Sequence, residues 1–176
     1  TGSFLVALDA SSGDEVWRVG RDEVENWSSP FVWENALRTE IVTAGLRQIR
    51  SYSLDGTLLW ELSGMTVNVV PTPFAQDGLV YISSGYPGGM PRPDYAIRPG
   101  ASGDISLGPG QNGNDFIVWY QPRLGTYNTS ALVYDGAYYT LLDRGFLLSH
   151  DARTGREIYG RTRVRPGSGF TASPWA

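Results

Sequence analysis

Short apolar runs, each bounded by Gly, Asn or Asp, alternate with polar stretches along most of the chain. β-branched and aromatic residues fill these runs, as is typical of strands. Val42, Leu46 and Ile49 also have the spacing of a helical face, but Gly45 interrupts them and the other repeats favour strands. The clearest stretch therefore predicts four strands, at residues 31–33, 40–44, 49–54 and 57–62.

Two Asp-Gly pairs, at 77–78 and 135–136, separate apolar runs. Asp-Gly tolerates the positive φ angles of a tight hairpin turn. Both pairs therefore predict β-hairpins, which join neighbouring antiparallel strands.

One segment of the chain is repeated. Residues 4–17 align without gaps to residues 146–159, at an offset of 142 residues. A middle copy at 50–60 keeps Asp55 and Trp60 but has a turn three residues shorter, and a copy around 95–99 has lost the Asp. Repeated supersecondary units stack into solenoids or propellers, so the period decides the fold.

A small polar residue followed by Pro marks the period independently. The pairs stand at 29–30, 72–73 and 173–174, with Ser130-Ala131 in the same place, at intervals of 43, 58 and 43 residues. A Gly- and Pro-rich insertion at 85–114 accounts for the long interval. Four strands in about 40 to 50 residues is the size of one propeller blade. The prediction is a β-propeller of four-stranded antiparallel blades.

The chain divides into about three full blades with partial blades at both ends. We expect a fragment of a longer propeller, completed by further blades or by self-association; a closed four-blade ring and an eight-blade ring of two copies are the alternatives. The predicted segments are a half blade at 1–20, blades at 21–64, 65–124 (with the insertion 85–114) and 125–165, and the first strand of another blade at 166–176.

The repeated segment resembles the pyrroloquinoline quinone (PQQ)-type propeller repeat, often called the tryptophan-docking motif. The resemblance covers nearly the whole chain and implies that Trp17 and Trp60 pack between neighbouring blades, with Trp119 and Tyr159 in the equivalent places. The residues that it assigns to blade packing are Ala7, Asp9, Gly13, Trp17, Asp55, Trp60, Trp119, Asp151, Gly155 and Tyr159.

The family includes dehydrogenases and a lipoprotein that assists outer-membrane protein assembly, in rings of seven or eight blades. The resemblance therefore implies a bacterial, periplasmic or extracellular location. It specifies architecture more strongly than function, because the motif residues pack blades.

Composition narrows the function classes. The chain has 14 Arg, no Lys and 18 acidic residues, so its net charge of −4 does not support nucleic-acid binding. The lack of Cys excludes disulfides and thiol chemistry, and no apolar run reaches the ~18 residues of a membrane span. His150 is the only His, and its alignment with Leu8 and Leu54 predicts a strand position.

The best candidates for ligand binding come just before the predicted inner strands, which line the channel of a propeller. Polar amides that orient a ligand and rings that stack on it are typical of binding pockets. The alternative is that these residues cap turns. The insertion is either a binding lip or a passive excursion. The candidates at these positions are Asn26, Trp27, Asn68, Tyr127 and Asn128, with Ser168 and Phe170 at the last one, and Arg123 is a further candidate for ligand binding.

Two functions fit these observations. The favoured one is a noncatalytic propeller that binds a protein, peptide or glycan and needs no cofactor or metal. The alternative is a segment of a PQQ- and Ca²⁺-dependent alcohol or sugar dehydrogenase, in which Trp27, Arg123 and Asn128 would contact the cofactor. No catalytic residue can be assigned, and the fold alone supplies no reaction.

Overall fold

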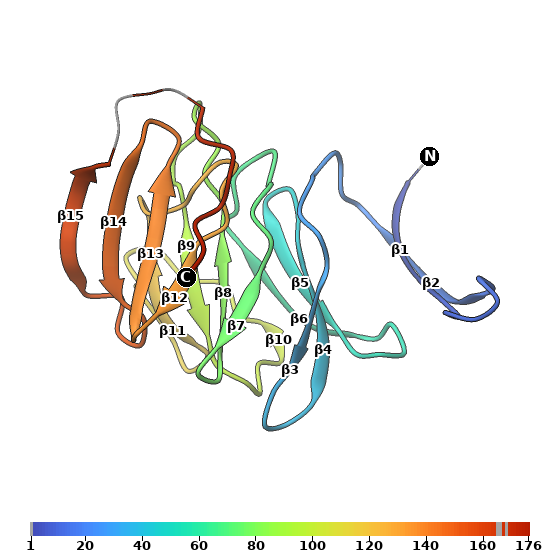
Figure 1. Cartoon of the computed structure of the whole chain (residues 1–176). Coiled ribbons are helices and arrows are strands. Elements are labelled where there is room, and N and C mark those ends of the chain that lie inside the picture. The colour runs from blue at the N-terminus through green and yellow to red at the C-terminus, as the bar shows by residue number, and fades with distance from the viewer. Residues whose placement is uncertain (1, 165–166, 168) are drawn as a thin grey trace.

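A computed structural model describes residues 2–164, 167 and 169–176, which form fifteen strands and no helix (Figure 1). The all-β prediction is confirmed. In these same residues there is accordingly no helix long and apolar enough to cross a membrane. Ser168 lies outside the described residues.

The strands form four sheets, which stand side by side in chain order (Figure 1). The first sheet consists of β1 (Ser3–Leu8) and β2 (Glu15–Arg21). The second consists of β3 (Phe31–Glu34), β4 (Thr39–Ala44), β5 (Gln48–Tyr52), β6 (Leu58–Ser63) and the short β10 (Gly103–Asp104). The third consists of β7 (Phe74–Gln76), β8 (Leu79–Ser83), β9 (Asp94–Ile97) and β11 (Ile117–Gln121). The fourth consists of β12 (Leu132–Tyr134), β13 (Ala137–Leu142), β14 (Phe146–Asp151) and β15 (Glu157–Arg163).

Apart from β10, each strand pairs antiparallel with the strand beside it, as blades require. The two predicted hairpins are present. Asp77 and Gly78 have φ of 50° and 80°, and Asp135 and Gly136 have 48° and 73°. Left-handed angles at both central positions are those of the hairpin turn that matches strand twist.

Hydrogen bonds between successive blades join repeat-equivalent residues. Ser28 Oγ donates to the Pro71 carbonyl (2.8 Å), and the Ser130 N–H donates to Ser173 Oγ (2.9 Å); both pairs are 43 residues apart. The Thr72 N–H donates to Ser130 Oγ (3.2 Å) across the 58-residue interval. These contacts therefore recur at the period read from the sequence. They tie together the connections that lead into the inner strands of successive blades.

The third sheet is buried on both sides, because alternate residues of a strand face opposite ways. Ile82 of β8 packs in one apolar cluster with Trp60 of the second sheet. Its neighbour Tyr81 packs in another cluster with Tyr138 of the fourth sheet. The core therefore lies between the sheets, as in stacked blades.

The insertion at 85–114 has two parts. Its first part leads into β9, the third strand of its own blade. Its second part runs along the edge of the preceding blade, where β10 pairs parallel with β6 and the Ile105 N–H donates to the Glu61 carbonyl (2.9 Å). Arg38 Nη2 also donates to the Ala101 carbonyl (2.6 Å). The second part therefore braces two blades together.

Gly125 lies where two connections cross, and Gly125→Ala is expected to destabilise the fold by about 1–3 kcal/mol, the usual cost of overpacking. A Cβ there would lie 2.1 Å from the Ser84 carbonyl oxygen and 2.7 Å from that of Pro93, and backbone moves less readily than a side chain. Urea unfolding measures the change. Gly20→Ala is the control, because a Cβ there meets nothing within 4 Å. Equal stability of the two variants would contradict this packing.

Candidate functional site

The functional candidates gather at one end of the sheets. We call this end the top face and define it by the connections 22–30, 45–47, 64–73, 84–93, 122–131 and 143–145. It is the upper end of the sheets in Figure 1. The opposite end carries the hairpin turns at Gly78 and Gly136 and the repeated Asp-to-Gly turns.

Two of the tryptophans assigned to blade packing reach the next blade. Trp17 Nε1 donates to the Leu54 carbonyl (2.8 Å), and a Cβ on Gly56 would lie 3.0 Å from the Trp17 ring. Trp119 Nε1 donates to the Ala152 carbonyl (2.8 Å), and a Cβ on Gly155 would lie 2.7 Å from its ring. Glycine in the receiving turn thus leaves room for the indole.

The acidic residue of the repeat shapes that turn. Asp9 Oδ1 accepts hydrogen bonds from the N–H groups of Ser11 and Ser12 (both 2.9 Å) and from Ser11 Oγ (2.6 Å). These bonds, led by that from the Ser11 side chain, lower the pKa of Asp9 to about 2. Asp151 has the equivalent bonds, and Asp55 accepts from the Thr57 N–H (3.1 Å). Local turn formation explains these residues without a ligand.

Trp60 differs from this pattern. Its Nε1 donates to Glu40 Oε2 (2.7 Å) within its own blade, and the same oxygen accepts from Ser51 Oγ (2.6 Å). The following blade has no Asp-to-Gly turn to receive the indole, and the insertion packs against that side through Ala101 and Ile105 instead. Tyr159, in β15, is partly exposed, and Ala7 pairs with Trp17 across the first sheet.

The candidates before the inner strands lie on the top face without forming one pocket. Trp27 is 53% exposed, and its N–H donates to the Val69 carbonyl (2.9 Å). Asn68 has φ of 54°, as a turn residue would. The side chains of Asn26, Asn68 and Asn128 are half-buried. Their amide groups make no hydrogen bond to another group within residues 2–164.

Tyr127 and Arg123 both lie on the connection between β11 and β12. Tyr127 packs edge-on against Tyr86, with 5.5 Å between ring centroids, and its N–H donates to Asp143 Oδ1 (3.3 Å). Phe170 is half-buried, and its N–H donates to the Asp143 carbonyl (3.1 Å). Arg123 lines a hollow of about 390 Å³ between β11 and the outer strands of the fourth sheet. Arg123 therefore does not share a pocket with Trp27.

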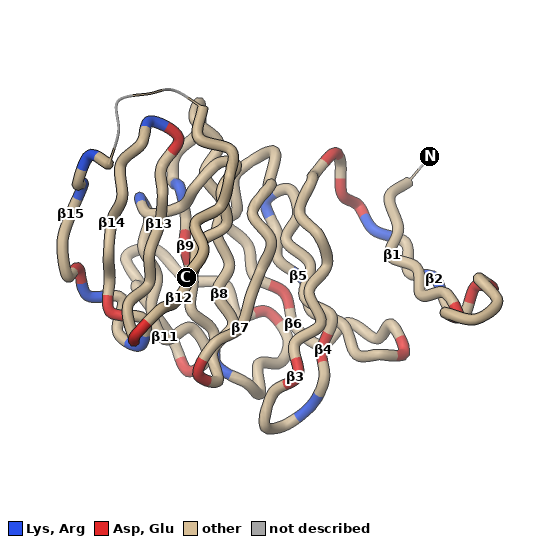
Figure 2. The backbone as a smooth tube through the Cα atoms, in the orientation of Figure 1, with Lys and Arg blue, Asp and Glu red and all other residues tan. Residues whose placement is uncertain are grey.

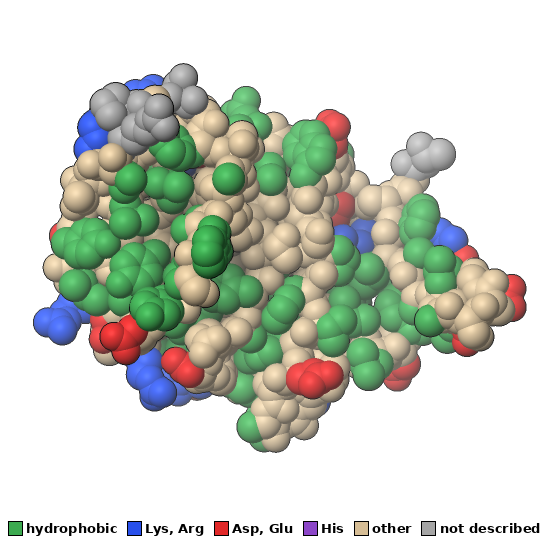
Figure 3. Space-filling view, in the orientation of Figure 1, with side chains coloured by type: hydrophobic (Ala, Val, Ile, Leu, Met, Phe, Trp, Pro, Cys, Tyr) green, Lys and Arg blue, Asp and Glu red, His purple; other side chains and the backbone are tan. Residues whose placement is uncertain are grey.

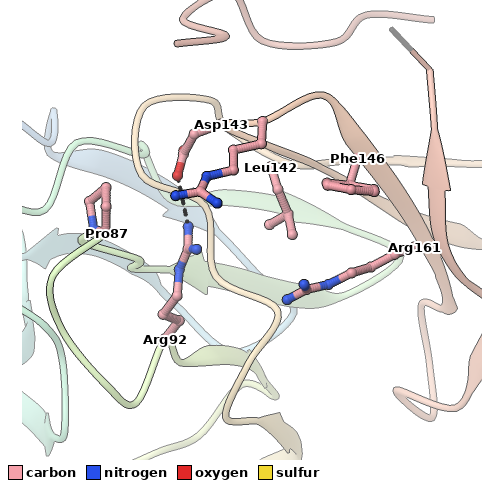
Figure 4. Close-up of a pocket in the computed structure, with 7 residues that line it drawn as sticks. Pro87, Arg92, Leu142, Asp143, Phe146 and Arg161 are labelled. Atoms are coloured by element: carbon pink, nitrogen blue, oxygen red, sulfur yellow. Dashed lines mark hydrogen bonds and ion pairs between the residues drawn. The ribbon is translucent and has the colours of Figure 1, made fainter. Parts of the chain in front are cut away.

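A second hollow, of about 210 Å³, lies where the third and fourth sheets meet at the top face (Figure 4). Arg92 Nη2 and Asp143 Oδ2 form an ion pair across it (3.2 Å). It is lined by Pro87, Arg92, Leu142, Asp143, Arg144, Phe146 and Arg161. Sequence reasoning did not identify it, because Arg92 and Asp143 are 51 residues apart and meet through blade stacking alone.

A hydrogen bond between two buried side chains, Tyr138 and Asp94, also joins the third and fourth sheets. Tyr138 Oη donates to Asp94 Oδ1 (2.6 Å), and both side chains are fully buried. Burial raises the pKa of Asp94 to about 8, and the hydrogen bond from Tyr138 offsets only part of that effect. The carboxyl is therefore largely neutral at pH 7, as a buried acid without a cation partner should be.

The structured part of the chain contains no group of three His, Cys, Asp or Glu that could hold a metal. His150 lies in β14, as its alignment predicted, and burial lowers its pKa. Trp27 lies on the connection 22–30, whereas Arg123 and Asn128 both lie on the connection 122–131.

Comparisons with known proteins identify the fold. No protein-family model and no curated protein matches the chain. Among solved structures, BamB from Moraxella catarrhalis is similar, with 20% sequence identity and a TM-score of 0.61. The match covers 89% of this chain and 42% of that chain, so this chain spans less than half the length of its structural relative. Together with the four-stranded antiparallel sheets, this likeness confirms the β-propeller fold.

Proposed function

We propose that this propeller segment is a noncatalytic binding module that docks a protein or peptide on its top face. We further propose that it belongs to an exported, periplasmic or extracellular, bacterial protein. The observation that carries the binding proposal is a set of exposed apolar side chains on three connections of the top face, Val24, Trp27, Val67 and Met90. Trp and Met are enriched in protein interfaces, and Trp often dominates their binding energy.

The connections that present these side chains are already fixed to one another. The Trp27 N–H donates to the Val69 carbonyl (2.9 Å), and the Thr66 N–H donates to Ser84 Oγ (3.0 Å). A surface held in place loses little conformational entropy on binding. The amides of Asn26, Asn68 and Asn128 can then orient the partner's backbone. The aliphatic side chains of Val24, Val67 and Met90 favour a protein or peptide over a glycan.

The open sides of the first and fourth sheets are proposed to pack against further blades or another copy of the chain. Phe4, Leu8 and Val16 are exposed on the first sheet, and Tyr134 and Ile158 on the fourth. Figure 3 shows hydrophobic side chains gathered over the fourth sheet. Unpaired blade faces of this kind associate readily.

Trp27→Ala tests the docking proposal. Peptides selected from a random library against the full chain should bind the variant about 10-fold or more weakly, as expected for an interface hot spot. Isothermal titration measures the affinities. Ile158→Ala is the matched control, because Ile158 is also 53% exposed but lies on β15, away from the top face.

Equal affinities for Trp27→Ala and Ile158→Ala would contradict docking on the top face. Stoichiometric uptake of PQQ with Ca²⁺, together with dye-linked oxidation of alcohols or sugars, would instead establish the dehydrogenase alternative.

A further inference from the structure

The hollow at the meeting of the third and fourth sheets has the size of a subsite. Its volume of about 210 Å³ is below the ~300 Å³ at which pockets for whole small molecules begin. It can hold one side chain or a small anion. The connection 84–93 and the β13–β14 turn form its walls at the top face, next to the connection that carries Tyr127.

The hollow carries excess positive charge. Asp143 already pairs with Arg92 (3.2 Å) and accepts the Tyr127 N–H (3.3 Å). Within the described part of the chain, no carboxylate lies within 4.0 Å of the guanidinium of Arg144 or Arg161. Figure 2 shows basic positions at the upper ends of β13 to β15. Two guanidinium groups therefore remain for an anion.

The apolar residues that line the hollow favour an anionic group carried on a hydrocarbon chain. Pro87, Leu142 and Phe146 supply carbon surface, and Figure 4 shows Arg92 and Arg161 reaching into the same space from different elements. The Arg161 guanidinium carbon lies 6.0 Å from the centre of the Phe146 ring, and that of Arg163 lies 4.2 Å from it. Contacts with an aromatic ring hold guanidinium groups in place for bidentate binding.

We propose that this hollow binds the carboxylate side chain of an acidic segment in the partner, with the methylene groups of a glutamate against Leu142 and Phe146. The proposal rests on the proposed function, because the acidic segment belongs to the protein or peptide docked on the top face. Guanidinium groups bind carboxylates through two parallel hydrogen bonds, so Arg144 and Arg161 select for negative charge. Inorganic phosphate shares the charge but lacks the apolar stem.

The test uses the full chain and a short fluorescent peptide of Glu, Leu and Gly, with a matched peptide in which every Glu is Gln. Fluorescence anisotropy at low ionic strength measures the affinities, because salt screens exposed charges. Arg161→Gln should weaken binding of the Glu peptide about 10-fold, the loss expected for one hydrogen-bonded charge. Arg144→Gln should act in the same direction, and the Gln peptide should not bind.

Arg153→Gln is the matched control, with the same change of charge on an exposed turn at the opposite end of the blade. It should change the affinity less than twofold. Arg161 is exposed, so the variant should keep the unfolding transition of the native chain. Equal losses for Arg161→Gln and Arg153→Gln, or displacement of the Glu peptide by phosphate at lower concentration than by free glutamate, would overturn the proposal.

The outcome is separable from that of the docking proposal. If library peptides depend on Trp27 but the Glu peptide is indifferent to Arg161, the acidic subsite is wrong and docking stands. If the Glu peptide depends on Arg161 while Trp27→Ala has no effect on library peptides, the subsite stands and the docking surface is wrong.

Discussion

Replacing Trp119 by alanine is expected to lower the free energy of unfolding by about 3–5 kcal/mol, the usual cost of removing a buried Trp. Trp119 is only 4% exposed and packs edge-on against Tyr138, with 5.4 Å between ring centroids. Its removal leaves a cavity between the third and fourth sheets. The Ala152 carbonyl keeps a hydrogen bond from Tyr81 Oη (3.1 Å), so most of the loss comes from the cavity. Urea unfolding measures the change.

Trp175→Ala is the control for this experiment. Trp175 is 92% exposed, so its replacement should change stability by no more than about 0.5 kcal/mol. Similar losses for the two variants would show that Trp119 does not hold the blades together.

The stability difference between the native chain and Asp94→Asn is expected to depend strongly on pH. The folded pKa of Asp94, about 8, lies above the ordinary value of 3.8, so the folded state keeps a proton that the unfolded state releases. Asp94 therefore favours folding most below pH 3.8, and this contribution falls as pH rises toward about 8. The slope approaches about 1.4 kcal/mol per pH unit inside that window.

Asparagine does not titrate, so Asp94→Asn should become progressively more stable than the native chain as pH rises through this window. Chemical unfolding at a series of pH values measures both curves. Tyr138→Phe removes the hydrogen-bond donor that lowers the pKa of Asp94. In this variant the loss of stability with rising pH should therefore continue to a higher pH than in the native chain. If the stability of the native chain and that of Asp94→Asn changed in parallel with pH, the claim that the buried carboxyl of Asp94 is neutral would be contradicted.

The repeats in the sequence were sufficient to predict the propeller and most of its strands, whereas β9 and β10 form inside the predicted insertion and the described part of 166–176 forms no strand. Strand alternation, Asp-Gly turns and the small-polar marker are local patterns, and stacked blades repeat them at a fixed period. The Asp-to-Gly turn around Asp9 and Gly13 forms through hydrogen bonds among neighbours, so it too is visible locally.

Contacts between blades could not be predicted in the same way. Asp94 meets Tyr138 across 44 residues, and neither side chain carries a local sign of its partner. The indole of Trp60 donates to Glu40 in its own blade, and an insertion some forty residues later packs against it. The arginine-lined hollow likewise depends on how far one sheet is displaced along the next. Only the stacking geometry brings such residues together.

Docking on the top face is tested most directly by mapping a selected peptide on the isotope-labelled full chain by NMR. The predicted result is that amide shifts change on the connections 22–30, 64–73, 84–93 and 122–131, and that Arg161→Gln reduces the changes beside Asp143 when the peptide is acidic. Changes confined to the opposite end, around Gly78, Gly136 and Gly155, would contradict the binding surface proposed for this propeller.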